Sequence, residues 1–164
     1  MRMTAHTARL AIALGRALAE RGWRAATAES CTGGLVAAAI TDIPGSSGWF
    51  DRGFVTYTDD AKRTDLAVPA TLLATHGAVS EPVARAMAEG AVARSAADVA
   101  VSITGIAGPG GGTPGKPVGT VCFGFARRAG EAEARTLHLE GDRAAVRAQS
   151  VDIALEGLIG LTQA

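Results

Sequence analysis

The sequence predicts a three-layer α/β/α domain around a mixed, mostly parallel sheet, of the kind found in the α/β class. Segments with helical periodicity come before, between and after segments with strand-like alternation, which favours a sheet covered by helices on both faces. The later strand candidates follow one another without a helix between them, so not every strand can be parallel. A length of 164 residues fits a single domain over residues 1–164.

The first half of the chain alternates predicted helices and strands. A helix is expected over about residues 7–21, where Leu10, Leu14 and Leu18 recur every four residues, and Gly22 ends it. The short strand "WRAATAES" follows, then a second helix in "GGLVAAAITD" that is expected to start at the glycines. The aromatic and β-branched residues of "RGFVTYT" predict the next strand.

The second half begins with a helix in "SEPVARAMAEGAVARSA", with Ser80 as its cap and Pro82 in its first turn. The segments "DVAVSITG", "VGTVCFGFA" and "ARTLHLE" are predicted strands, and Asp142 is expected to cap a last helix that runs to about residue 161. A loop with seven glycines and three prolines, residues 105–119, joins two of these strands, and a loop of this length in a compact domain is usually functional or disordered.

Composition excludes several classes of protein. Sixteen basic side chains balance sixteen acidic ones, which argues against a dedicated nucleic-acid binder. Arg9 and Arg16 interrupt the apolar N-terminal stretch, so it is interpreted as an amphipathic helix rather than a signal peptide, and no membrane span is expected. Two cysteines without CxxC spacing suggest a cytoplasmic protein, and the three histidines lack the spacing of metal ligands, so no metal is expected.

The stretch "AESCTGG" is the first candidate for chemistry. Ser30 follows a predicted strand, and small residues then open a helix, so its hydroxyl would lie at a sharp turn near free backbone N–H groups. A plain N-cap with a glycine turn explains the same residues equally well. The stretch is not the G-x-S-x-G elbow of lipases, because Ala28 stands in place of the first glycine.

A reactive serine needs a base, and Lys62 is a better candidate than any histidine. The chain has only two lysines against fourteen arginines, so a lysine used merely for solubility would be unusual here. Lys62 can act as a base only if its pKa is lowered, and a nearby Tyr57 hydroxyl could relay the proton. The alternative is a solvated lysine after an acidic pair.

An anion site is suggested by two further features. The glycine-rich loop resembles a nest of convergent N–H groups, although it matches neither a Walker loop nor a dinucleotide fingerprint. Arg143 falls in the first turn of the last predicted helix, where a cation is unfavourable for the helix dipole. An arginine in such a place suits a phosphate ligand.

Six blocks in this order resemble the CinA C-terminal domain family: "AESCTGG", "DIPGSSGWFDRGFVTYTDDAK", "HGAVSEPVA", "SITGIAGPGGG", "KPVGTV" and "GDR". They cover most of the chain, and the resemblance is to the stand-alone nicotinamide-nucleotide amidohydrolases called PncC, without the N-terminal molybdopterin-binding-like domain of longer CinA proteins. It implies hydrolysis of the carboxamide of nicotinamide mononucleotide to nicotinate mononucleotide and ammonia, in pyridine nucleotide salvage, with no cofactor.

Under this resemblance, Ser30 is the expected nucleophile, Lys62 the base and Tyr57 the relay, with Ser47 of the "PGSSGW" loop as a relay or rival nucleophile. The expected substrate-binding residues come from the turn after Ser30, from the start of the glycine-rich loop and from the last helix, and Glu29 is added as a carboxylate for the pyridinium. They are Glu29, Thr32, Gly33, Gly34, Thr104, Gly105, Gly108, Gly110, Gly111 and Arg143. Glu29 could instead only orient the turn.

Three other readings of the sequence stay open. They are a Cys31 hydrolase with His76 as base, a non-catalytic nucleotide-binding module in a competence or DNA-damage response, and an amidase for another small amide. A homo-oligomer, most simply a dimer, is also expected, because Trp49 and Phe50 would otherwise expose apolar side chains in a loop.

Overall fold

The computed structural model describes residues 2–163 as a five-stranded sheet with the strand order β2-β1-β3-β4-β5. The strands are β1 (Ala25–Glu29), β2 (Phe50–Val55), β3 (Val99–Gly105), β4 (Thr120–Arg127) and β5 (Glu133–His138). The helices are α1 (Ala5–Arg21), α2 (Leu35–Thr41), α3 (Asp59–Leu66), α4 (Ala70–His76), α5 (Glu81–Ala93) and α6 (Arg143–Gln163), with a short 3₁₀ turn, η1 (Ser46–Gly48), before β2.

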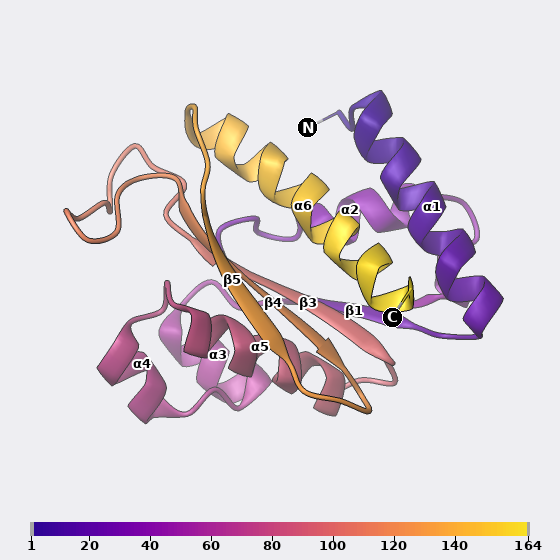
Figure 1. The fold of residues 1–164 in the computed structure, drawn as a ribbon, viewed down its shortest axis with the longest axis horizontal. Helices are drawn as coiled ribbons and strands as arrows, with labels where there is room; N and C mark the ends of the chain where they lie inside the picture. Colours follow the sequence, from indigo (N-terminus) through magenta and orange to yellow (C-terminus); the bar gives the residue numbers. More distant parts are fainter. Residues whose placement is uncertain (1, 164) are drawn as a thin grey trace.

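The sheet lies between two layers of helices. Figure 1 shows α1, α2 and α6 on one face and α3, α4 and α5 on the other. Strand β1 pairs in parallel with both β2 and β3, whereas β4 pairs antiparallel with β3 and with β5. The predicted three-layer architecture and mixed sheet are therefore confirmed.

Each face of the sheet has its own apolar core. Along β3, Val99, Val101 and Ile103 pack with α1, α2 and α6, whereas Ala100 packs with α5 on the opposite face. All four residues are fully buried. The alternation that predicted this strand therefore reflects two faces that both pack against helices, rather than one packed face and one face exposed to solvent.

One predicted helix start needs correction, and two helices were missed. Helix α2 begins at Leu35 rather than at the glycines, because Gly33 and Gly34 have φ values of 57° and 100°, which belong to a turn and not to a right-handed helix. Helices α3 and α4 were not predicted, since they have only 8 and 7 residues. Thr58, whose side chain accepts from the N–H of Ala61, was the available signal for the start of α3.

Trp49 is not an exposed loop residue, as the sequence suggested. Its indole ring is buried against Gly15 of α1, where a Cβ atom would lie only 2.7 Å from the ring. Phe50 is half-buried and forms the start of β2. These residues belong to the core, so they give no reason to expect an oligomer.

No helix within residues 2–163 has the length and apolar character that a bilayer crossing requires.

Candidate active site

The candidate active site lies where the three parallel strands end. Ser30 directly follows β1, Thr56 directly follows β2, and Thr104 and Gly105 end β3. In the sheet, β1 lies between β2 and β3, so the connections that lead from β1 to β2 and from β2 to β3 run in opposite directions across the sheet. Ligands in open α/β sheets bind at such a switch point, outside the carboxyl ends of the strands.

Ser30 and Lys62 meet at this point. The Lys62 Nζ lies 3.0 Å from the Ser30 Oγ and 2.9 Å from the carbonyl oxygen of Thr56, to which it donates. Ser30 is held in place because its N–H donates to the carbonyl of Ile103 in β3. Ser30 is only 8% exposed and Lys62 only 1% exposed, so neither side chain is a solvated surface group.

Burial changes the acid–base properties of Lys62. Loss of hydration disfavours the ammonium and lowers the pKa of Lys62 below its ordinary value of 10.5, although the nearby Asp59 opposes this shift. A lysine with a lowered pKa and a hydroxyl within hydrogen-bond distance has the geometry of a general base beside a nucleophile. Sequence reasoning named this pair, and the fold brings the two side chains together.

Glu29 does not face the cleft. Its fully buried carboxylate accepts hydrogen bonds from the N–H groups of Val36 and Ala37, and from the Thr27 hydroxyl. These contacts satisfy the first turn of α2, which is the orienting role that the sequence left open. The expected contact with a substrate has no support in this geometry.

Of the three turn residues expected to offer free N–H groups after Ser30, Thr32 and Gly34 do so and Gly33 does not. The N–H of Gly33 donates to the carbonyl of Ser30, and that of Leu35 donates to Thr32. Within residues 2–163, the N–H groups of Cys31, Thr32 and Gly34 have no acceptor, and the fully buried Thr32 hydroxyl has no partner either. The free donors therefore belong to the turn itself and not to the first turn of α2.

Tyr57 and Arg143 meet at the rim of the cleft rather than in its depth. A guanidinium nitrogen of Arg143 donates to the Tyr57 hydroxyl at 3.1 Å, and another donates to the carbonyl of Gly108 at 2.9 Å. Tyr57 is 58% exposed, and its hydroxyl bonds to Arg143 and not to Lys62. The expected proton relay from Lys62 through Tyr57 is therefore not formed here.

The glycine-rich loop contributes to the cleft only at its beginning. Thr104 and Gly105 line the cleft, and Thr104 donates to the carbonyl of Ala78. A side chain at Gly105 would collide with Val121, which explains the glycine there by packing. Gly110 and Gly111 are exposed and lie outside the lining, so their expected ligand contact has no support.

Ser47 lies at the opposite end of the strands, where they begin. It is exposed in η1, just before β2 begins, whereas Ser30 follows the end of the neighbouring parallel strand β1. Because β1 has 5 residues, its length alone separates the two ends by roughly 16 Å. Within one chain, Ser47 can serve neither as a proton relay for Ser30 nor as a rival nucleophile beside Lys62.

The cleft around Ser30 and Lys62 has a volume of about 220 Å³. Asp59 is the one carboxylate among its lining residues in the described chain. A second cavity, between the loop and the start of α6, shares Ala107 and Arg143 with the cleft and adds Arg147 to its wall. A larger cavity elsewhere, under β5, contains no nucleophile beside a base, so chemistry rather than size identifies the site.

Sequence reasoning missed Arg147. Its guanidinium donates to the carbonyls of Cys31 at 3.1 Å and of Thr32 at 3.4 Å, so it fixes the turn that holds Ser30. The available signal was its spacing: Arg147 stands four residues after Arg143, on the same side of α6. Asp59 was missed for a different reason, because its helix was not predicted.

Replacing Arg147 with glutamine should lower the stability of the protein. The Cys31 carbonyl would lose its donor and the Thr32 carbonyl would keep only the N–H of Leu35, at a cost of about 1 kcal/mol or somewhat more. For a protein of this size, this corresponds to a fall in Tm of about 2–4 °C per kcal/mol. Thermal unfolding would measure it, with Arg94→Gln as a matched control, because Arg94 is exposed at the end of α5 and forms no side-chain hydrogen bond within residues 2–163. Equal Tm values for the two variants would contradict the role assigned to Arg147.

The alternative that uses Cys31 and His76 finds no support. Burial raises the pKa of the Cys31 thiol to about 11, which disfavours the reactive thiolate. His76 is exposed at the end of α4 and does not line the cleft.

The fold and the cleft define an α/β/α protein with a buried serine–lysine pair at the switch point of its sheet. The chain belongs to the CinA C-terminal domain family, whose sequence profile matches residues 7–162. It is 57% identical over 145 residues to the nicotinamide-nucleotide amidohydrolase PncC of Escherichia coli K12, with 88% of each chain covered.

Two further comparisons place the chain among CinA-type proteins. It is 61% identical over 151 residues to a putative competence-damage inducible protein of Symbiobacterium thermophilum, but it spans only 35% of that relative's length. The crystal structure of the competence/damage inducible protein CihA from Agrobacterium tumefaciens superimposes with a TM-score of 0.96 at 46% identity, over 99% of both chains.

Proposed function

We propose that the protein hydrolyses the carboxamide of nicotinamide mononucleotide to nicotinate mononucleotide and ammonia, within pyridine nucleotide salvage. The observation that supports this most strongly is the 3.0 Å contact between Ser30 Oγ and a buried Lys62 Nζ in a cleft. Relatives named nicotinamide-nucleotide amidohydrolase, with which the chain shares 53–57% identity, support the choice of substrate.

In the proposed chemistry, neutral Lys62 donates one N–H to the Thr56 carbonyl and uses its lone pair to take the Ser30 proton. The Ser30 Oγ then forms a bond to the carboxamide carbon, and the free N–H groups of the turn at Cys31, Thr32 and Gly34 are candidates to stabilise the oxyanion. Lys62 returns the proton to the amide nitrogen as the carbon–nitrogen bond breaks and ammonia leaves. Water, deprotonated by Lys62, hydrolyses the resulting ester and restores Ser30.

The proposed substrate orientation follows from the charges around the cleft. The carboxamide lies at Ser30, and the pyridinium lies near Asp59, which replaces Glu29 as the carboxylate for this charge. The 5′-phosphate extends toward the adjoining cavity, whose wall includes Arg143 and Arg147.

Replacing Arg143 with alanine should raise KM for nicotinamide mononucleotide by about tenfold, because one charge-assisted hydrogen bond to the phosphate is lost and the residue is exposed. The same variant should leave KM for nicotinamide riboside, which lacks the phosphate, almost unchanged. Steady-state ammonia release with both substrates measures the difference. A similar rise for both substrates would show that Arg143 does not contact the phosphate.

The proposed function is tested by ammonia release across a panel of pyridine nucleotides and free nicotinamide. We expect the mononucleotide to give the highest kcat/KM. Stoichiometric nucleotide binding without ammonia release would favour a non-catalytic binding module, and a preference for another amide would identify a different amidase.

A further inference from the structure

Strand β5 ends the sheet with an unpaired edge. It is the last strand in the sheet order, and its register continues through the hydrogen bond from the Leu139 N–H to the Gly119 carbonyl. Because hydrogen-bonded and non-hydrogen-bonded pairs alternate in an antiparallel ladder, Glu133, Arg135 and Leu137 direct their backbone groups toward β4. The N–H and C=O groups of Ala134 and Thr136 point outward, and within residues 2–163 no hydrogen bond engages them.

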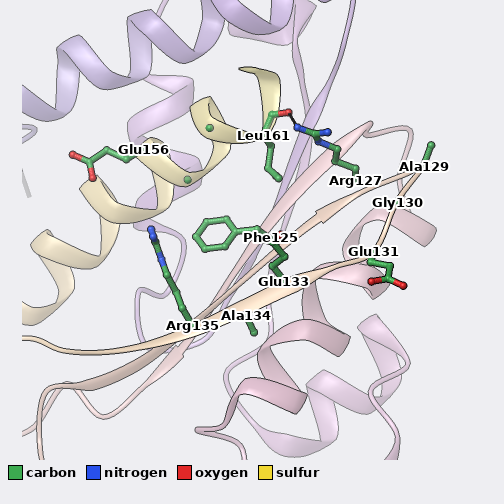
Figure 2. Close-up of a pocket in the computed structure, with 12 residues that line it drawn as sticks. Phe125, Arg127, Ala129, Gly130, Glu131, Glu133, Ala134, Arg135, Glu156 and Leu161 are labelled. Carbon is green, nitrogen blue, oxygen red and sulfur yellow. Dashed lines mark hydrogen bonds between the residues drawn. The ribbon is translucent and has the colours of Figure 1, made fainter. Parts of the chain in front are cut away.

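The face of β5 toward α6 is open. Helix α6 packs on β3 and β4, and it leaves a cavity of about 570 Å³ beside β5. Figure 2 shows Phe125 at the floor of this cavity, with Glu133 and Arg135 along β5 and Glu156 on α6. The Arg135 guanidinium lies over the Phe125 ring at 5.1 Å, and neither Glu133 nor Arg135 forms an ion pair within the described residues.

We infer that β5 is the interface with a second copy of this chain, through antiparallel pairing of the two β5 edges about a twofold axis at Ala134. This register places Glu133 opposite the partner's Arg135, and Arg135 opposite the partner's Glu133. Both pairs are non-hydrogen-bonded pairs, in which side chains are closest. The small side chain of Ala134 lies at the axis.

The other registers that match the outward backbone groups are less favourable. An axis at Arg135 would place the two arginines directly opposite each other, which is destabilising. An axis at Thr136 would place Arg135 opposite the partner's Leu137 and leave both charges without partners. A free edge also invites uncontrolled pairing, and a defined dimer removes that hazard by covering it.

Sedimentation velocity at micromolar concentrations tests this interface. The unmodified protein should be a dimer, and a monomer would overturn the inference. Glu133→Arg and Arg135→Glu should each raise the dissociation constant by about tenfold or more, because each places like charges opposite one another. The double variant should restore the dimer, since both pairs form again with reversed sign. A double variant that stays monomeric would overturn the register.

Proline variants test whether the dimer forms through the backbone of the β5 edge. Ala134→Pro removes an outward N–H without touching the β4 ladder, so it should abolish the dimer while the fold survives. His138→Pro makes the same kind of change on the same edge, beyond the paired segment, and should leave the dimer intact. Circular dichroism confirms that each variant is folded. A dimer that persists in Ala134→Pro, or that is lost equally in His138→Pro, would contradict the proposed pairing.

Discussion

Replacing Ser30 with alanine should reduce single-turnover ammonia release from nicotinamide mononucleotide by about 10⁴-fold or more, which is the scale seen when a nucleophile is removed from a catalytic unit. The reason is that Ser30 Oγ is the one hydroxyl within hydrogen-bond distance of Lys62 Nζ among the described residues. Removing it leaves only slow attack by water. The fold should be unaffected, because alanine fills the same buried space with one atom fewer.

Ser47→Ala is the matched control for this prediction. Ser47 is exposed at the end of the sheet where the strands begin, so Ser47→Ala should turn over substrate at the normal rate. Near-normal chemistry in Ser30→Ala would exclude Ser30 as the nucleophile, and a large loss in Ser47→Ala would contradict the placing of Ser47 outside the site.

Replacing Lys62 with methionine should lower kcat by about 10²–10⁴-fold, the range expected for loss of a general base. Methionine is preferred to arginine as the replacement because Lys62 is almost fully buried, and the larger guanidinium would not fit. Lys116→Met is the control: the only other lysine donates to the carbonyl of His76, outside the cleft lining, and its loss should leave kcat unchanged. Equal activity of the two variants would remove Lys62 from the mechanism.

The pH dependence of activity and of stability follows from the same residue. Because the neutral amine is the working form, activity should rise with pH up to the lowered pKa of Lys62 and then level off. In the unfolded chain, Lys62 has its ordinary pKa of 10.5. At pH values between the lowered pKa of the folded protein and 10.5, the unfolded chain therefore binds more protons than the folded protein. The free energy of unfolding contributed by Lys62 therefore rises with pH across that window. Chemical denaturation of wild type and Lys62→Met at several pH values would show this rise only in the wild type.

The central pair of the site could be predicted from the sequence because unusual residue choices marked it. Ser30 stands at a strand end before two glycines, and Lys62 is one of two lysines in an arginine-rich chain. Strand ends collect at one end of a parallel sheet, and this is where the structure brings the two residues together. The helical layers were predictable for a similar reason, since the periodicity of α1 and α5 reports directly on their buried faces.

The directions of individual side chains could not be predicted. Glu29 and Ser30 are neighbours, yet one caps α2 and the other lines the cleft, because successive residues at the end of a strand point to opposite faces. Tyr57 was expected beside Lys62, but α3 turns Lys62 inward and leaves Tyr57 at the rim with Arg143. Such outcomes depend on the geometry of turns that no local pattern specifies.

Rapid acid quench of a single turnover, followed by peptide mass spectrometry, tests the central claim most directly. If Ser30 attacks the carboxamide with Lys62 as its base, the quenched enzyme will carry the acyl group of nicotinate mononucleotide as an ester on Ser30, and ammonia release will precede release of the nucleotide product. An acyl group found on Cys31 or on Ser47 instead would contradict the account.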